Sequence, residues 1–497
     1  MALLGIDVGS SSVKAAVVDA ASGRVLGSGQ HPATELAIDA PRPGWAEQDP
    51  ATWWASAKEA VRAALAAGET SGDDVEAVGV AYQMHGLVCL DKDGELLRPS
   101  IIWCDSRAVE TGREAFEALG AETCLPRLLN SPGNFTASKL AWVKQNEPAV
   151  FDRIERVCLP GDYLAGRLTG EVVTTVSGLS EGVFWDFRGG EPAGFLLEHF
   201  GLSADLLAPV VPTFGAQGEV TAQAAEAFGL KAGTPVTYRA GDQPNNALSL
   251  NVLKAGEVAA TAGTSGVVYG VADTVKYDPR SRINSFAHVN HRHDDPRLGL
   301  LLCINGTGIA LAWARRTLGG DLGYDALTTL AEQAPAGSDG LTVLPFGNGA
   351  ERMLEDAAVG GQLVGADFNR HDRSHVARAV QEGIAFSFRY GMDILRDNGV
   401  DLGVIRAGRA NLFQSPLFRA TLAAVADTTI ELYETDGAVG AARGAGIGAG
   451  VYASPEEAFA HLERVGVTEP ESDTAPRPAV EDAYGRWREA LERQLRP

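Results

Sequence analysis

A carboxylate stands near the start of the chain, at the end of an apolar run and directly before a turn of glycine and serine. The carboxylate is Asp7, and the turn follows as Gly-Ser-Ser-Ser at residues 9–12. Glycine lets backbone amides approach a phosphate closely, and serine adds hydroxyl donors. Aspartate at this place can hold Mg²⁺, which keeps part of its water shell when bound. The alternative is an ordinary hairpin with an aspartate at its turn.

The same pattern returns near the middle of the chain. Residues 256–270 again read as a run of small residues, a Gly-Thr-Ser-Gly tip at residues 263–266 and an apolar run that returns. One such hairpin opens each half of the sequence, which favours phosphate binding over a chance turn. The repeat predicts two related domains, at residues 1–248 and 249–497.

A second aspartate, Asp242, lies between glycine and glutamine at the end of another predicted strand, just before helix-forming residues. An enzyme that transfers a phosphoryl group to a hydroxyl needs a group that accepts the hydroxyl proton, and an aspartate at such an edge can do so. The alternative is a helix N-cap. The two roles are compatible.

Two further clusters follow predicted strands. Gln83, Met84 and His85 come directly after the apolar run 75–81, at the end of a strand where open α/β sheets place their ligands. A lone histidine is more often structural, but this position and these neighbours favour contact with a sugar. Residues 407–411 follow another strand and could lie under a nucleotide base. The glycine and alanine run at 437–445 predicts a helix that packs closely on its neighbour.

Strand and helix patterns alternate along the whole chain, which predicts an α/β fold. Strands are expected at residues 2–10, 13–19 and 25–36, and a helix at 50–67 with Asp49 as its N-cap. A final helix at 480–495 could pack only on the surface.

Several classes of protein are disfavoured. Asp and Glu number 64 against 42 Lys and Arg, giving a net charge of −22 that suits nucleic acid poorly. A Walker-type phosphate loop and a dinucleotide fingerprint are missing, and five scattered cysteines form no CxxC pair. No apolar run is long enough to span a membrane, and the N-terminus lacks a basic leader, so a cytoplasmic location is expected.

These stretches together resemble the FGGY carbohydrate kinases, and within that family the xylulokinases. The resemblance covers nearly the whole chain in order, and it includes further segments at residues 45–50, 102–107, 135–142, 159–164, 382–383 and 437–442. It implies two actin-like domains of the ribonuclease H type with the active site in the cleft between them. It also implies an ATP-dependent sugar kinase that uses Mg²⁺ and can form a homodimer.

The resemblance also implies a role for each motif. Asp242 is expected to be the catalytic base, and Asp7 to place magnesium and ATP. The positions that match sugar contacts are Met84, His85, Trp103, Asp242 and Gln243. The positions that match nucleotide or phosphate contacts are Gly9, Ser10, Ser11, Lys14, Gly263, Thr264, Gly308, Gly408 and Asn411.

The Met84-His85 pair resembles xylulokinases, whereas glycerol kinases carry Arg-Glu there, so the expected reaction converts D-xylulose to D-xylulose 5-phosphate. Two alternatives stay open. One is a kinase for another ketose or polyol, such as ribulose, a hexulose or glycerol. The other is a non-catalytic sugar or nucleotide sensor on the same fold, suggested by Ala-Gly-Arg-Ala at 407–410, where the family usually has Gly-Gly-Gly-Ala. The two intact aspartates argue against a sensor.

Overall fold

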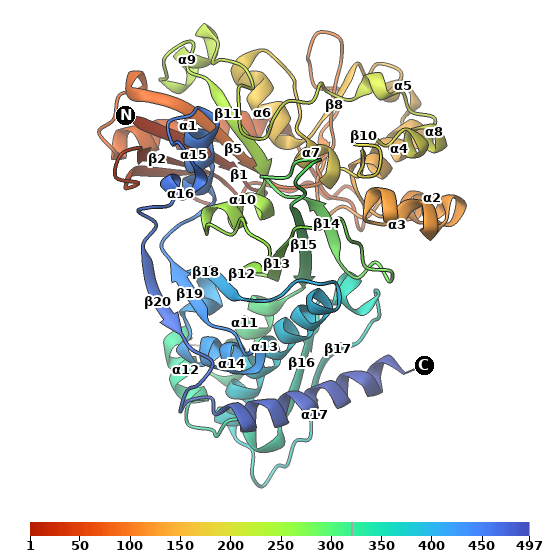
Figure 1. Ribbon diagram of the computed structural model, residues 1–497. Coiled ribbons are helices and arrows are strands. Elements are labelled where there is room, and N and C mark those ends of the chain that lie inside the picture. Colours follow the sequence, from red (N-terminus) through yellow and green to blue (C-terminus); the bar gives the residue numbers. More distant parts are fainter. Residues whose placement is uncertain (320–321, 497) are drawn as a thin grey trace.

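The computed structural model describes residues 1–319 and 322–496. Two β-sheets lie one above the other, each with helices packed against it (Figure 1). The first sheet runs, in spatial order, β11 (Val236–Gly241), β5 (Val75–Tyr82), β1 (Ala2–Val8), β2 (Val13–Asp19) and β3 (Val25–His31). The second runs β14 (Asn284–Ala287), β15 (Leu298–Ile304), β13 (Gly266–Ala272), β12 (Glu257–Ala262), β18 (Val404–Gly408), β19 (Ile430–Tyr433) and β20 (Arg464–Thr468).

The two sheets repeat one topology. In the first, β1 and β2 and then β2 and β3 pair antiparallel, while β5 and β11 run parallel to β1. In the second, β12, β13 and β15 pair antiparallel, and β18 and β19 run parallel to β12. This strand order confirms the predicted α/β class with two ribonuclease H-like sheets. The repeated hairpin in the sequence is therefore the first turn of a repeated sheet.

The strands form where the sequence predicts them. The strands β1 and β5 are buried along almost their whole length, as expected for central strands covered on both faces, and the edge strand β11 is also buried throughout. The edge strand β3 is largely exposed and ends at His31, not at residue 36 as expected. The next residue, Pro32, has no backbone N–H with which to continue the ladder.

The helices surround these sheets, and shorter strands connect them. Asp49 caps α1 as predicted, accepting a hydrogen bond from the Ala51 amide. The helices of the first half are α1 (Pro50–Ala67), α2 (Val109–Leu119), α3 (Ala121–Leu128), α4 (Thr136–Asn146), α5 (Pro148–Phe151), α6 (Pro160–Thr169), α7 (Val176–Glu181), α8 (Gly194–Phe200), α9 (Ala222–Phe228) and α10 (Asp242–Ser249). Those of the second are α11 (Thr307–Leu318), α12 (Tyr324–Ala331), α13 (Arg373–Asp397), α14 (Pro416–Ala426), α15 (Gly437–Gly448), α16 (Pro455–Ala458) and α17 (Arg477–Leu495). The small ladders pair β4 (Glu47–Gln48) with β7 (Ser100–Ile101), β6 (Val88–Leu90) with β8 (Arg156–Cys158), β9 (Trp185–Asp186) with β10 (Glu191–Pro192), and β16 (Thr342–Phe346) with β17 (Gly360–Val364).

The helix α15 follows β19 of the second sheet but packs on the first, where it is seen in blue beside the red strands of Figure 1. Its alanines share one core cluster with β1, β2, β5 and β11. In return, α10 contacts α15 and buries Ala247 with Ala259 and Tyr269 of the second sheet. The division at residues 248 and 249 stays a prediction, and it falls within the C-terminal end of α10.

The C-terminal helix α17 is not merely a surface helix, so that expectation is wrong. Trp487 is fully buried, and its indole Nε1 donates to the Val343 carbonyl at 3.0 Å. Aromatic side chains of α13 and β16 surround this ring. No helix among the described residues has the length and apolarity needed to cross a membrane.

The close packing of α15 on the first sheet gives a test. A Cβ at Gly79 in β5 would overlap the backbone oxygen of Ala441, which cannot move without shifting α15. Gly79→Ala should lower the free energy of unfolding by about 1–3 kcal/mol, measured by urea titration.

The matched control is Gly485→Ala, because Gly485 lies in α17 with open space around its Cα. There, alanine should raise the free energy of unfolding by about 0.5–1 kcal/mol. Equal effects of the two substitutions would contradict the account of α15 packing.

Candidate active site

One cavity of about 280 Å³ brings the first-half motifs together. Its lining consists of Asp7, Gly9, Ser10, Ser11, Ser12, Lys14, Gln83, Trp103 and Asp242. These residues come from the β1–β2 hairpin, the ends of β5 and β11, and the loop after β7. The volume is at the small end of ligand sites and suits a sugar or a few phosphate groups.

The two aspartates in this cavity are partly buried, and a further negative charge lies close to each of them. Burial, and then the negative charge of Asp436, raise the pKa of Asp7 from 3.8 to about 6, while Lys14 opposes the rise. Burial, and then the charge of Asp7, raise the pKa of Asp242 from 3.8 to about 7, while hydrogen bonding by Gln243 opposes the rise. Near neutral pH, Asp242 can therefore exchange a proton readily.

Two helix N-termini meet at these aspartates. Asp242 is the first residue of α10, and the start of α15 at Gly437 lies against the Asp7 carboxylate, so closely that a Cβ there would overlap it. The Asn245 side chain donates to the Gly437 carbonyl at 2.8 Å and ties the two helices together. Helix N-termini favour negative charge, so the site suits a carboxylate and an incoming phosphate.

The β1–β2 turn is held in place from behind by Gln48. The turn closes with the Gly9 amide donating to the Ser12 carbonyl at 3.0 Å. Gln48 Nε2 donates to the Ser10 carbonyl at 2.7 Å, while its Oε1 accepts from Trp53 Nε1 at 3.1 Å and Gln83 Nε2 at 3.0 Å. The buried side-chain amide of Gln48 therefore links the β1–β2 turn to α1 and to the residue that follows β5.

Three of the predicted sugar-contact residues, Met84, His85 and Gln243, are not among the residues that line the cavity. Met84 is buried, and its side chain lies against the backbone of Gly241, directly before Asp242. Gln243 follows Asp242 in the first turn of α10. Met84 and Gln243 therefore lie close to Asp242, Met84 by packing on the residue before it and Gln243 as the residue after it.

His85 is held in one orientation and one tautomer. Its Nδ1 donates to the Glu181 carbonyl at 2.9 Å, and its ring packs on Phe135 and Phe286 with centroids 4.9 and 5.3 Å away. Burial, and then the Lys139 charge, lower the pKa of His85 to about 3, so its ring is neutral. With the proton on Nδ1, the Nε2 atom can accept a hydrogen bond from a hydroxyl.

A second cluster gathers the nucleotide motifs of the second sheet. The Gly308 amide donates to the Gly263 carbonyl at 3.0 Å, and a Cβ at Gly308 would overlap that carbonyl. The Asn411 side chain lies next to Gly263. Thr264 is exposed at the β12–β13 tip, and Gly408 ends the neighbouring strand β18. These five positions therefore sit together around the β12–β13 hairpin.

Among the described residues, no group of three His, Cys, Asp or Glu side chains converges as a metal cage. Asp7 nonetheless fits a magnesium ion, which is typically bound by one or two carboxylates, water and the phosphates of a substrate. Burial and the Asp436 charge raise the pKa of this carboxyl, and a bound cation would oppose both effects.

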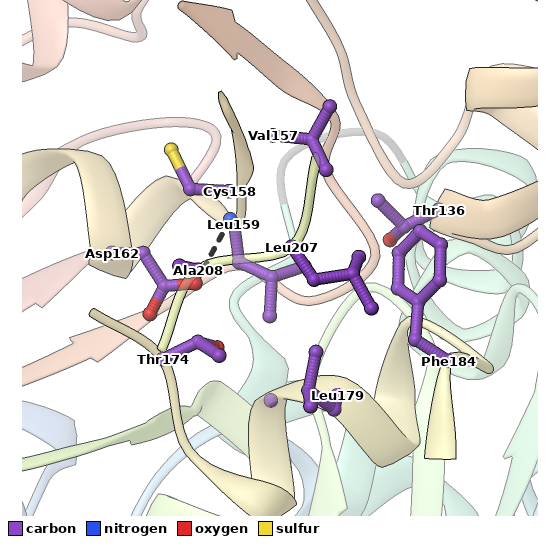
Figure 2. A pocket seen from close by; sticks show the side chains of 11 residues that line it. Thr136, Val157, Cys158, Leu159, Asp162, Thr174, Leu179, Phe184, Leu207 and Ala208 are labelled. Atoms are coloured by element: carbon purple, nitrogen blue, oxygen red, sulfur yellow. Dashed lines mark hydrogen bonds between the residues drawn. The ribbon is translucent and has the colours of Figure 1, made fainter. Parts of the chain in front are cut away.

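A second, much smaller cavity of about 10 Å³ lies behind α6 and α7 (Figure 2). Its apolar lining includes Leu159, Leu179 and Phe184. Asp162 also lines it, and its carboxylate accepts a hydrogen bond from the Leu159 amide at 3.1 Å. Its volume is close to that of one water molecule and far below that of a sugar. The candidate active site is therefore the larger cavity.

Sequence reasoning missed the residues that support the site from behind. Gln48 and Lys139 are buried polar side chains, Glu181 orients His85, and Phe286 reaches the histidine from the second sheet. Phe286 lies in β14, far from His85 in the sequence. Local spacing carries no signal for such contacts, because they depend on the placement of distant elements.

Comparison with known proteins agrees with this arrangement. Residues 2–249 match the N-terminal domain, and residues 258–451 the C-terminal domain, of the FGGY family of carbohydrate kinases. The chain is 30% identical to a xylulose kinase of Escherichia coli over 462 residues, covering 92% of each chain. A solved xylulose kinase of Rhodospirillum rubrum has a TM-score of 0.88 at 28% identity, covering 100% of this chain and 99% of that one. A Plasmodium falciparum glycerol kinase solved with ADP has the same fold, with a TM-score of 0.88 at 20% identity, covering 100% and 98%.

The role of Gln48 can be tested by Gln48→Leu, which keeps the side-chain size and removes its hydrogen bonds. Trp53 Nε1 and Gln83 Nε2 would lose a buried acceptor, so the free energy of unfolding should fall by about 2–4 kcal/mol in a denaturant titration.

The matched control is Gln30→Leu, because Gln30 is exposed on the edge strand β3. Its effect should stay within about 0.5 kcal/mol. If Gln48→Leu were equally neutral, Gln48 would not be the support of the turn.

Proposed function

The chain belongs to the FGGY family of carbohydrate kinases, and we propose that it transfers the γ-phosphoryl group of ATP to a terminal hydroxyl of D-xylulose. That it is a sugar kinase that uses ATP follows from the family. The identity of the sugar and the roles of single residues are the proposal. The observation that carries it is the position of Asp242, in one cavity with Asp7 and the β1–β2 turn.

Asp242 acts as the general base. It stands at the first position of α10, where the end of β11 opens into the cavity. With a pKa of about 7, the carboxylate is basic enough to take the proton of the sugar hydroxyl and still be ionised at neutral pH. The hydroxyl oxygen then attacks the γ-phosphorus in line as the bond to ADP breaks.

The two hairpins hold the phosphates. The turn formed by Gly9, Ser10 and Ser11, with Lys14 behind it, presents amides, hydroxyls and an ammonium to the cavity. The Gly263 and Thr264 tip, with Gly308 packed against it, supplies a second set of amides, and Gly408 and Asn411 extend this cluster toward the nucleotide. Fixed donors of this kind stabilise the charge that develops on the transferred phosphoryl group.

Asp7 is the residue that would hold magnesium. Its carboxylate lies against the N-terminus of helix α15 and in the same cavity as Asp242. Bound Mg²⁺ would neutralise part of the phosphate charge. Asp7 itself also keeps the pKa of Asp242 high, because two neighbouring carboxylates resist simultaneous ionisation.

The choice of D-xylulose rests on the Met84-His85 pair and on the xylulose kinases among the relatives. His85 offers a fixed acceptor, and Trp103 lines the cavity with Asp242. Met84 packs on Gly241, directly before Asp242, and Gln243 directly follows it. The fold does not select the sugar, because a glycerol kinase shares it. An assay is therefore needed to distinguish a D-xylulose kinase from a kinase for another ketose or polyol and from a non-catalytic sensor. The homodimer and the cytoplasmic location stay predictions.

The proposal is tested by a coupled ADP-release assay with ATP and Mg²⁺ against D-xylulose, L-xylulose, D-ribulose, L-ribulose, D-fructose and glycerol. D-Xylulose should give the highest kcat/KM. Asp242→Asn should reduce kcat by about a thousandfold or more, because it removes the proton acceptor without changing the side-chain size.

The control Asp372→Asn alters an exposed helix cap on α13 and should leave kcat unchanged. High turnover of another sugar would keep the mechanism and change the substrate. Tight sugar binding with no turnover of any compound would favour the sensor.

The pH dependence follows from the same carboxyl. Asp242 must be ionised to accept a proton, and its pKa is raised to about 7, so activity is lost as pH falls through that value. We expect kcat/KM to rise about tenfold per pH unit below pH 7 and to level off above it. The titration of Asp7, with a pKa of about 6, acts in the same direction and makes the fall steeper below pH 6. A profile that is flat from pH 5 to 8 would contradict Asp242 as the base.

A further inference from the structure

Two tight turns present the residues proposed to meet the sugar. In the first, His85 follows β5 with φ +61°, a left-handed backbone that non-glycine residues rarely adopt. In the second, the Asp105 amide donates to the Ile102 carbonyl at 3.2 Å, which leaves Trp103 half-exposed at the tip. The Trp103 Nε1 atom also reaches Ser10 Oγ at 3.5 Å. Trp103 lines the cavity, and so does Gln83, two residues before His85, so the spacing of these two turns sets part of the shape of the cavity.

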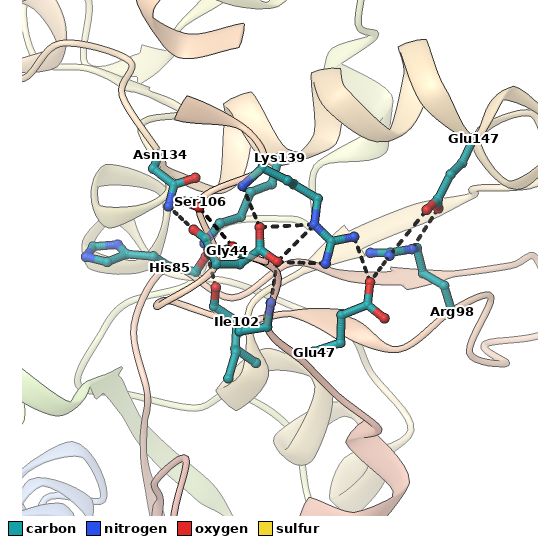
Figure 3. Close-up of polar contacts among 12 residues, drawn as sticks. Gly44, Glu47, His85, Arg98, Ile102, Ser106, Asn134, Lys139 and Glu147 are labelled. Atoms are coloured by element: carbon teal, nitrogen blue, oxygen red, sulfur yellow. Dashed lines mark hydrogen bonds and ion pairs between the residues drawn. The ribbon is translucent and has the colours of Figure 1, made fainter. Parts of the chain in front are cut away.

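One buried cation joins the two turns (Figure 3). Lys139, on α4, has no exposed surface, and its Nζ donates to the His85 carbonyl at 2.8 Å and to the Ile102 carbonyl at 3.1 Å. Both acceptors are backbone atoms, one at His85 itself and one directly before Trp103. A movement of either turn would break a bond to the same ammonium group.

The buried charge of Lys139 is not there to complete an ion pair. Among the described residues, no carboxylate is close enough to the Lys139 Nζ atom to form a salt bridge with it. The nearby Asp105 carboxylate is already used by the Arg107 guanidinium, at 2.7–3.0 Å, and by the Ala46 amide, at 2.6 Å. Burial lowers the pKa of Lys139 to about 7, because the charged form of the side chain is less stable away from water. An apolar side chain of similar length would avoid that cost but could not bind two carbonyls.

The geometry points to Lys139 as a positioning residue for the sugar: it fixes the distance between the His85 turn and the Trp103 turn, and so determines sugar affinity. The inference rests on the proposed function, because it takes both turns as walls of the sugar site. It predicts that loss of the two hydrogen bonds weakens sugar binding much more than ATP binding, since the second hairpin cluster is untouched.

The chain offers a matched control on the same helix. Lys144 also lies on α4, and its Nζ also donates to two successive backbone carbonyls, at Phe200 and Gly201. Those carbonyls belong to the end of α8 and not to the cavity. Lys139→Met and Lys144→Met therefore remove the same kind of interaction from two places, only one of which faces the sugar turns.

The experiment measures KM for ketose and for ATP in both variants. For Lys139→Met, the ketose KM should rise about 10- to 100-fold, with the ATP KM within about twofold of wild type. Lys144→Met should leave both values unchanged. A ketose KM within about twofold of wild type, or equal rises in both KM values, would overturn the inference. If Lys139→Met does not fold, Lys139→Gln replaces it and is judged by the same outcomes.

Hydrogen–deuterium exchange gives a second readout that needs no activity. In the Lys139 variant, amides of residues 83–88 and of 101–107 should both exchange faster, and in Lys144→Met neither segment should change. Faster exchange in only one segment, or in neither, would show that Lys139 does not couple the turns. If the wild-type protein phosphorylates no ketose, the proposed function fails, while this comparison still decides the coupling.

Discussion

The site depends on holding two partly buried carboxylates in one cavity. Burial raises the pKa of both carboxyls, and a neighbouring negative charge adds to the rise, from Asp436 at Asp7 and from Asp7 at Asp242. Left alone, such a pair would favour protonation and destabilise the fold. The surrounding structure offsets this with positive ends of helices: α10 begins at Asp242, and α15 begins against Asp7. The same fields that stabilise two carboxylates also suit a phosphate, so the structural constraint and the proposed chemistry require the same arrangement.

This constraint explains why the two halves of the chain exchange helices. The start of α15 can reach Asp7 only if α15, which follows β19, crosses to the first sheet. Its glycines and alanines, with Gly5 and Gly79 on the strands, remove the side chains that would keep the backbones apart. The crossing also couples the halves mechanically, because α10 and α15 pack on each other between the two sheets. A change in the arrangement of the sheets would therefore move both helix N-termini at the aspartates.

The sequence predicted the parts of this structure that local patterns encode. Apolar runs placed β1, β2 and β5, Asp49 capped α1, and the glycine-serine turns marked both hairpins. The run at 437–445 indicated close helix packing but could not say on which sheet, because the partner is distant in the chain. The burial of Trp487 in α17 was missed for a similar reason. Gln48, Lys139 and Phe286 act through tertiary contacts, and a single buried amide, ammonium or ring has no periodic signature.

The two sheets differ most in one connection, the link between their two parallel strands, and most of the residues proposed to meet the sugar lie there. In the second sheet, the two parallel strands β18 and β19 are joined by residues 409–429 alone. In the first, the equivalent link from β5 to β11 spans residues 83–235, and it contains Met84, His85, Trp103 and the supporting Lys139. In contrast, the aspartates stand in or directly after repeated strands, and the two hairpins join repeated strands. Phosphoryl transfer is thus tied to the common sheet topology, while the proposed choice of sugar is tied to an inserted segment that can change without altering the catalytic frame.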